Sequence, residues 1–282
     1  MKPIIIVIVL IGLLLVVGFS TTTTAPTVVV TTPTTTVIPV VIPPVVAPKP
    51  EALVEDNPPA KPGVSGSLKG VAKYNGPVPI QGVKQIPLNA AADCKCNSVP
   101  DESLIVDPAT SGLKWVVIRI MDITPKNAPP LEPAYTLTQK GCRFSPHIVT
   151  VPPGVDLNIL NPDGILHNIH TTPYDSNDPA QNFAVTKDAL YKGQWLKEPD
   201  LIEVKCDVHG WMKAFILCHD PRYCAISDTD GTFEIKSLPP GKYKVNIWHE
   251  SFGNYLKQEA IDVEIKAGAA TDMGELKFAP KK

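Results

Sequence analysis

The sequence predicts an all-β protein, and three observations lead to that class. Prolines number 31 in 282 residues, and charged residues make up 19%, which favours strands and extended linkers over a helical bundle. Short apolar or alternating segments recur between turns rich in Gly, Pro and Asn, as in sandwiches and barrels. Beyond the N-terminal apolar run, no segment keeps an apolar 3.6-residue period for three turns.

Residues 1–20 have the layout of an export signal. Lys2 precedes an apolar run from Ile4 to Phe19, and the small residue Ser20 follows it. The run is slightly shorter than the roughly 17 to 25 residues that usually span a bilayer, so a retained N-terminal membrane anchor is the alternative to a cleaved signal peptide. Both interpretations predict an exported protein, located in the periplasm, at the cell surface or outside the cell.

Residues 21–63 consist largely of Thr, Val and Pro. Proline fixes φ and lacks an amide donor, so neither helix nor sheet propagates through such a segment. We expect an extended, semi-rigid and disordered stalk. We also expect the globular part to fold without it, because this composition cannot bury a core.

The chain from residue 64 onward is predicted to form short strands. Asn75-Gly76-Pro77 ends the first strand, and Pro152-Pro153-Gly154 joins two later ones. The predicted strands are 65–74, 114–120, 147–151, 155–160, 201–205, 232–235, 243–248 and 261–265. Many short strands separated by turns favour one or two β-sandwiches.

Charge and motifs exclude several classes of function. Lys and Arg total 26 against 28 Asp and Glu, a formal net charge of −2. No cationic excess is available to neutralise phosphates, so we expect no nucleic-acid partner. The chain has no Gly-x-Ser-x-Gly, no phosphate loop and no paired carboxylates in a recognisable setting. We therefore expect that it is not an enzyme.

The chemistry-bearing residues gather between residues 142 and 224. His167 follows a predicted strand, and Cys206, His209 and Met212 follow another about forty residues later. A soft thiolate, two imidazoles and a thioether suit copper better than zinc or magnesium. A trigonal site of two His and one Cys with a weak axial Met is the blue-copper arrangement. The sequence therefore predicts a site for one copper ion.

Residues 140–219 resemble a cupredoxin, the plastocyanin-like domain. The resemblance is carried by the opening Pro146 to Gly154, by Asn161 followed by His167-Asn168, and by the Cys206-x2-His209 pair. It implies a Greek-key sandwich in which His167, Cys206 and His209 are equatorial ligands and Met212 is the axial one. The chain departs from the plastocyanin pattern in one respect: Met212 lies three residues beyond His209 instead of five. No second Cys lies close enough to Cys206 for a binuclear site, so a single copper is expected.

Three neighbouring side chains have lesser expected roles. His170 lies three residues after His167, an odd offset that places it on the other face of a strand, so we expect a neighbour and not a ligand. His147, in the strand that opens the domain, is a lower-ranked replacement ligand. Trp211 offers an apolar edge beside His209 where a redox partner protein could dock.

The remaining cysteines leave alternatives open. Cys218 and Cys224 flank a turn-like stretch and could form a disulfide in an oxidising compartment. Cys142 could then pair with Cys94 or with Cys96. In the competing arrangement, Cys206 joins a third disulfide and no copper thiolate exists. Sequence does not define disulfide connectivity.

The C-terminal part carries a second resemblance. Residues 227–235 and 238–243, with turns at Asp230-Gly231 and Pro240-Gly241, resemble a carboxypeptidase regulatory-like domain, a transthyretin-like sandwich. The usual first strand of that family is similar to residues 65–74. We therefore expect 64–123 and 225–279 to form one sandwich into which the cupredoxin is inserted, with two tandem domains as the alternative. The combination resembles exported proteins labelled methylamine-utilisation or plastocyanin-like.

The main functional hypothesis is an exported or surface-anchored mononuclear copper protein that transfers one electron to a redox partner protein. It contacts the membrane only through a retained N-terminal segment. A cupredoxin fold can also persist without metal, so a second hypothesis is a cell-surface binding or adhesion module, with carbohydrate binding as one form. A copper carrier is the third.

Overall fold

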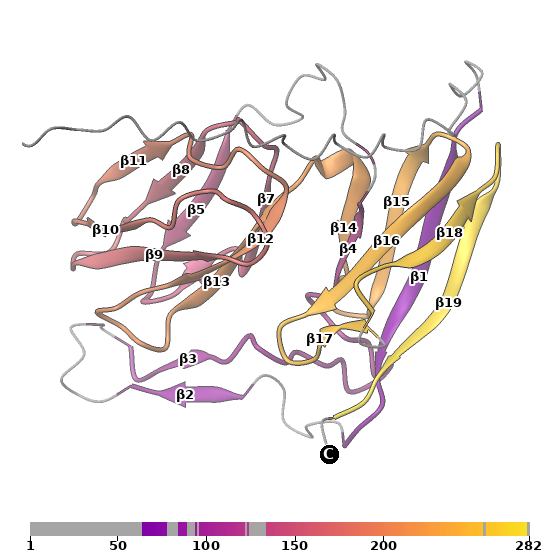
Figure 1. The fold of residues 1–282 in the computed structure, drawn as a ribbon. Helices are drawn as coiled ribbons and strands as arrows, with labels where there is room; N and C mark the ends of the chain where they lie inside the picture. Colours follow the sequence, from indigo (N-terminus) through magenta and orange to yellow (C-terminus); the bar gives the residue numbers. More distant parts are fainter. Residues whose placement is uncertain are drawn as a thin grey trace, which may run out of the picture. The chain divides into compact units, whose positions relative to one another are not determined.

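The computed structural model describes residues 64–77, 84–88, 94, 96–121, 123, 134–255 and 258–280. The expected export signal and stalk lie outside these residues. In this part of the chain the helical content is confined to 3-10 turns, namely η1(Pro221–Tyr223) and the turn at Tyr255. A search of the same residues finds no helix with the length and apolar character of a membrane span. The prediction of an all-β fold is confirmed (Figure 1).

The middle of the described chain forms a two-sheet sandwich, here called the central sandwich. Its sheets have the orders β10-β9-β12-β13-β7 and β11-β8-β5-β6. The pairs β13–β7 and β5–β8 are parallel and the other neighbours antiparallel. The strands are β5(Tyr135–Gln139), β6(Phe144–Ser145), β7(Ile148–Val151), β8(Leu157–Leu160), β9(His167–Pro173), β10(Asn182–Val185), β11(Leu190–Gly193), β12(Asp200–Lys205) and β13(Lys213–Cys218).

The core of the central sandwich accounts for some of the predicted strands, although the buried strands β5 and β13 are not among them. Alternating residues such as Leu157 and Ile159 on β8 are fully buried between the sheets. The edge strands β10 and β11 are largely exposed, so they carry little of the apolar pattern that predicts a strand. The turn Pro152-Pro153-Gly154 is present, and Gly154 has φ +77°, a conformation that favours glycine.

A second sandwich, here called the composite sandwich, combines strands from both ends of the described chain. Its sheets have the orders β15-β1-β19 and β14-β4-β16-β17, with β18 also paired to β16. A small hairpin, β2–β3, lies outside these sheets. The strands are β1(Gly66–Tyr74), β2(Gln85–Pro87), β3(Ser98–Pro100), β4(Val117–Ile120), β14(Cys224–Ile226), β15(Thr232–Leu238), β16(Gly241–His249), β17(Gly253–Asn254), β18(Ile261–Ile265) and β19(Ala270–Phe278).

Strand pairing places the central sandwich as an insertion between β4 and β14. β1 pairs with β15 and β19, and β4 pairs with β14 and β16. The turn at Gly231, with φ +86°, lies against β1, because a Cβ there would collide with the carbonyl of Ala72. The first and last strands therefore share one core, which includes Leu68, Ile118 and Ile247.

The two sandwiches also share a buried apolar contact. Phe215 and Leu217 on β13 pack with Val117 on β4 and Trp248 on β16. The aromatic rings of Phe215 and Trp248 lie edge to face, with centroids 4.9 Å apart. Each strand thus contributes one face to its own sandwich and the other to this contact.

Candidate metal centre

The central sandwich brings the expected ligands to one end of its larger sheet. His167 is the first residue of β9, and Cys206 directly follows β12. β9 and β12 are antiparallel neighbours, with His170 opposite Lys205, so the start of one strand meets the end of the other. His209 lies in the short loop that leads from Cys206 to β13. Residues 42 positions apart in sequence therefore become neighbours.

The ligand atoms of this trio converge. His167 Nδ1 lies 3.0 Å from His209 Nδ1, and Cys206 Sγ lies 3.8 Å from the same atom. All three ligand atoms lie within 4.8 Å of one another, and all three residues are buried. Metal bonds to imidazole nitrogen and thiolate sulfur are about 2.0 to 2.3 Å long, so atoms at these separations can reach one ion. The donor set of two imidazoles and one thiolate fits copper.

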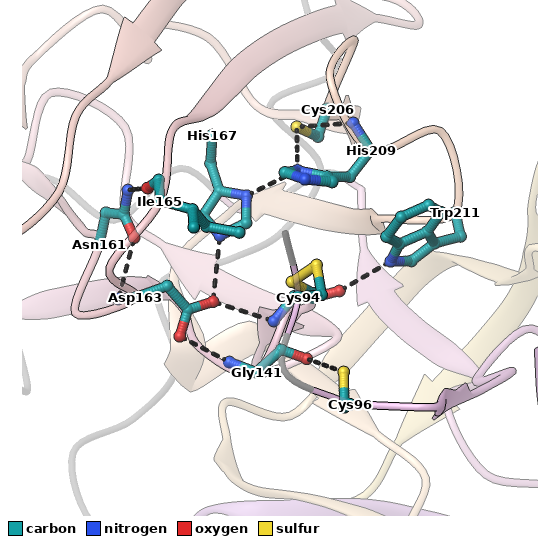
Figure 2. The surroundings of a disulfide bond; sticks show 11 residues. Cys94, Cys96, Gly141, Asn161, Asp163, Ile165, His167, Cys206, His209 and Trp211 are labelled. Carbon is teal, nitrogen blue, oxygen red and sulfur yellow. Dashed lines mark hydrogen bonds and ion pairs between the residues drawn. A yellow bond between two sulfur atoms is a disulfide. The ribbon is translucent and has the colours of Figure 1, made fainter. Parts of the chain in front are cut away.

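Asp163 orients His167 from the side opposite the ligand atom. His167 Nε2 donates to Asp163 Oδ2 across 3.0 Å, which leaves the lone pair of Nδ1 directed to the other ligands. The Asp163 carboxylate also accepts the backbone N–H groups of Gly141 and Cys142, each at 2.9 Å (Figure 2). Burial would raise the pKa of Asp163, but these amide donors and His167 outweigh it and lower that pKa.

The sulfur of Cys206 is held in a polar environment that favours the thiolate. The backbone N–H groups of Asn168 and His209 both donate to Sγ across 3.4 Å. Burial would raise the pKa of Cys206, but the hydrogen bonds from His167 and these two amides outweigh it and lower the pKa. Burial likewise opposes protonation of His167, yet Cys206 and Asp163 raise the pKa of that imidazole. To hold a metal here, Cys206 would be a thiolate and His167 a neutral imidazole.

Asn168 ties the two ligand-bearing segments together. Its side-chain carbonyl accepts the backbone N–H of Asp207, and its amide donates to the side chains of Asp207 and Asn182. The sequence pattern alone does not predict these supporting roles of Asp163 and Asn168. The available signal is position: an acid four residues before one ligand and an amide directly after it.

Met212 closes the ligand loop. Its backbone N–H donates to the carbonyl of His209 across 2.8 Å, and its carbonyl accepts the N–H of Cys206 across 3.3 Å. The side chain is buried in the core of the central sandwich. Its role as the axial ligand stays a prediction.

The other two histidines of this region lie outside the trio. His170 is half-exposed, and its Nδ1 lies 2.9 Å from Asp207 Oδ1. His147 is buried, and its Nε2 lies 2.5 Å from Glu250 Oε1, on the loop after β16. His147 therefore helps to join the two sandwiches and does not replace a ligand.

Trp211 packs against the ligands from the side of Cys142. Its ring centroid lies 5.2 Å from that of His209, and its Nε1 donates to the carbonyl of Cys142 across 3.0 Å. The indole is thus half-buried, while Val208 in the same loop is 52% exposed. Partner docking at Trp211 stays a prediction, to which the structure adds Val208 as the exposed apolar side chain.

The structure decides between the disulfide alternatives. Cys142 is bonded to Cys94 and not to Cys96. The expected Cys218–Cys224 disulfide is wrong, because Cys218 points into the core of the central sandwich and Cys224 into the contact between the sandwiches. Burial raises the pKa of each of these thiols to about 12. Cys206 is a free thiol, so the competing arrangement with Cys206 in a disulfide is also wrong.

Comparison with known proteins gives partial matches. The model of the family described as polysaccharide lyase family 4, domain II, matches residues 190–273. This range overlaps the end of the expected cupredoxin, 140–219, and most of the expected carboxypeptidase regulatory-like strands, 225–279, and the latter resemblance stays a prediction. No curated protein matches the chain.

Similar solved structures are copper proteins. A purple cupredoxin from Nitrosopumilus maritimus is 17% identical, with a TM-score of 0.25, and the match covers 29% of this chain and 97% of that one. An amicyanin mutant in the Cu(I) form is 14% identical, with a TM-score of 0.29 and coverage of 36% and 98%. A Cu-containing nitrite reductase from Thermus scotoductus SA-01 is 20% identical, with a TM-score of 0.27 and coverage of 36% and 26%.

Proposed function

We propose that this chain is an exported mononuclear copper protein that transfers single electrons. One observation carries the proposal: two imidazole nitrogens and one thiolate sulfur, from His167, His209 and Cys206, converge within 4.8 Å in a buried site. Two imidazoles and a soft thiolate form the donor set of blue-copper sites. Met212, at the end of the loop, is proposed as the weak axial donor.

The burial of the ligands favours electron transfer over bond chemistry. His167 is 0% exposed, Cys206 2% and His209 5%. Bound copper would supply a one-electron redox couple, and ligands as buried as these leave little surface for a substrate to contact at the metal. We therefore propose that the protein is not an enzyme.

The surrounding residues keep the ligands in place during the redox change. Asp163 fixes the His167 ring, and Asn168 links the start of β9 to the Cys206 loop. Such partners hold ligand orientation and tune affinity in metal proteins. The amides that donate to Cys206 Sγ stabilise negative charge on sulfur and so influence the potential.

Export and the second module complete the proposal. The N-terminal layout of Lys2 and the apolar run supports export by a signal peptide or anchor, and a disulfide at Cys94 and Cys142 is typical of oxidising compartments. The strand order and turn chemistry of the composite sandwich support a carboxypeptidase regulatory-like module that carries the copper domain.

Copper loading of the purified protein tests the proposal. One Cu(II) per chain and an intense visible thiolate-to-copper absorption band are expected for the wild type, and neither the band nor tight binding for Cys206→Ser. Cys218→Ser is the matched control, because it changes a buried thiol remote from the trio. No copper bound by folded wild-type protein would favour the metal-free adhesion module. Copper that binds without a redox-active band would favour the carrier.

A further inference from the structure

Three cysteines lie beside the proposed copper site without belonging to it. The Cys94–Cys142 disulfide lies between His209 and Gly141 (Figure 2). The sulfur atoms of Cys94 and Cys142 and a ring nitrogen of His209 all lie within 4.8 Å of one another, and all three residues are buried. This second group therefore shares one residue, His209, with the copper trio.

A third cysteine, Cys96, lies beside the Cys94–Cys142 disulfide. The Cys96 thiol donates to the carbonyl of Gly141, the residue before Cys142, across 4.0 Å. Cys96 is a free and partly exposed thiol. A cavity of about 360 Å³ is lined by Cys94, Cys96 and Cys142, together with Asp163. The other free thiols of the described residues, Cys206, Cys218 and Cys224, are buried, so Cys96 is the free thiol there that an external reagent reaches most readily.

Backbone hydrogen bonds couple Cys142 to the ligands on both sides. Its N–H donates to Asp163, which holds His167, and its carbonyl accepts from Trp211, which packs on His209. A disulfide that only stabilised the fold would need no third thiol in the same cavity. It would also need no hydrogen bonds that connect Cys142 to two of the proposed copper ligands. The cysteine sulfurs thus offer a series of donor atoms that leads from the cavity to His209.

We propose that reduction of the Cys94–Cys142 disulfide converts the cavity into a Cu(I) entry site. Its ligands are the sulfurs of Cys94, Cys96 and Cys142, and the ion passes from there to His209 and the copper trio. Soft thiolates select Cu(I), whereas disulfide sulfurs are not thiolate ligands, so the redox state of the cysteines opens and closes the site. This inference rests on the proposed copper function.

The steps balance with an external dithiol as the reductant. A dithiol thiolate attacks one sulfur of the Cys94–Cys142 bond, and its second thiol then resolves the mixed disulfide. The external dithiol is oxidised to a disulfide, and Cys94 and Cys142 are reduced to two thiols. Cu(I) displaces thiol protons as it binds and keeps its oxidation state. After the ion has moved on, the vacated thiolates take up protons, and exchange with an external disulfide restores the closed form.

Cu(I) titration of a Cys206→Ser variant tests the entry site apart from the copper trio. The variant is titrated with Cu(I) against bicinchoninate, a Cu(I) chelator, before and after reduction with a phosphine. We expect no tightly bound Cu(I) in the oxidised variant and one per chain in the reduced variant. Reduced Cys206→Ser that retains no Cu(I), or that loses its near-ultraviolet circular dichroism on reduction alone, would overturn the inference.

Further variants assign the ligands. Adding Cys94→Ser and Cys142→Ser to Cys206→Ser should remove the bound Cu(I). Adding Cys96→Ser to Cys206→Ser should lower the Cu(I) affinity at least about ten-fold. That is the lower end of the loss of metal affinity when a partner of a metal ligand is removed. Adding Cys218→Ser should change nothing. Equal Cu(I) affinity with Ser at residue 96 would overturn the three-thiolate site.

Loading of the copper trio tests the transfer step. Reduced protein that has Cys206 but carries Cys94→Ser and Cys142→Ser should load from the Cu(I)–chelator complex more slowly than reduced wild type, as shown by the visible band after oxidation. The final band should be equally intense in both. Equal loading rates would overturn the transfer. Absence of the band from oxidised wild type with Cu(II) would instead refute the copper function, while the Cys206→Ser titration still decides the entry site.

Discussion

Replacing Asp163 by Asn should weaken copper binding while leaving every proposed ligand in place. The carboxylate accepts from His167 Nε2 at 3.0 Å and from two backbone amides at 2.9 Å. An Asn side chain keeps one oxygen, so it cannot satisfy all three donors. If its amide turns the NH2 group toward His167, two donors face each other. The correct His167 tautomer then loses its stabilisation.

The magnitude follows from the role of such carboxylates. Loss of a carboxylate that orients a metal-bound His typically costs about 10- to 100-fold in metal affinity, which is about 1.4 to 2.7 kcal/mol of binding free energy. Because Asp163 is charged and largely buried, we expect a value toward the upper end. The variant should still give the visible band at saturating copper.

A competition titration followed by the visible band measures the change. Asp156→Asn is the matched control, because Asp156 is an exposed carboxylate in the turn before β8. Metal-free unfolding curves of both variants separate a loss of affinity from a loss of fold. Equal copper affinities for Asp163→Asn and Asp156→Asn would refute the assignment of Asp163 as the residue that orients His167.

Five further outcomes are expected. Cys206→Ser should abolish the visible band, whereas Met212→Leu should keep the band and raise the reduction potential, measured by voltammetry, because loss of an axial donor disfavours Cu(II). Burial lowers the pKa of His249 to about 4, so between about pH 6.5 and 4 the unfolded chain binds a proton that the folded chain does not. The free energy of unfolding should therefore fall by about 3 kcal/mol as pH drops through that range, and denaturant titrations of His249→Gln should lack this share of the slope. Gly231→Ala should lower the melting temperature of the whole described region, because its φ of +86° and its contact with β1 leave no place for a Cβ. Removal of residues 1–63 should leave the melting temperature unchanged; a large drop in a scanning calorimeter would show that the stalk packs on the folded part.

The convergence of the expected ligands was predictable in part, because His167 follows one predicted strand, Cys206 follows another, and Cys206-x2-His209 resembles the cupredoxin pattern. The structure adds that His167 begins β9, an antiparallel neighbour of β12, and this pairing brings His167 beside Cys206. The prediction that residues 64–123 and 225–279 form one sandwich likewise depended on the turn at Asp230-Gly231 and the strand after it. Both predictions need only the local sequence pattern of each strand and the pairing of two strands.

The supporting residues and the disulfide were less accessible from sequence. Cys94 and Cys142 are 48 residues apart and belong to different parts of the fold, so their pairing depends on three-dimensional packing. Cys218 and Cys224 are close in sequence, yet β13 and η1 direct them into two different cores. Sequence proximity therefore favoured the wrong pair. Asp163 needed the approach of residues 141 and 142 before its role became visible.

Backbone hydrogen bonds close the short loop between Cys206 and Met212, in which Met212 lies three residues beyond His209 where the plastocyanin pattern has five. Its ends are joined by the hydrogen bond from the Cys206 N–H to the Met212 carbonyl, and its second half is folded by the bond from the Met212 N–H to His209. His209 is thereby fixed with Nδ1 toward His167 and its ring against Trp211. Trp211 is in turn bonded to Cys142, and a ring nitrogen of His209 lies within 4.8 Å of the sulfurs of Cys94 and Cys142. The same short loop therefore holds His209 beside both the copper trio and the Cys94–Cys142 disulfide.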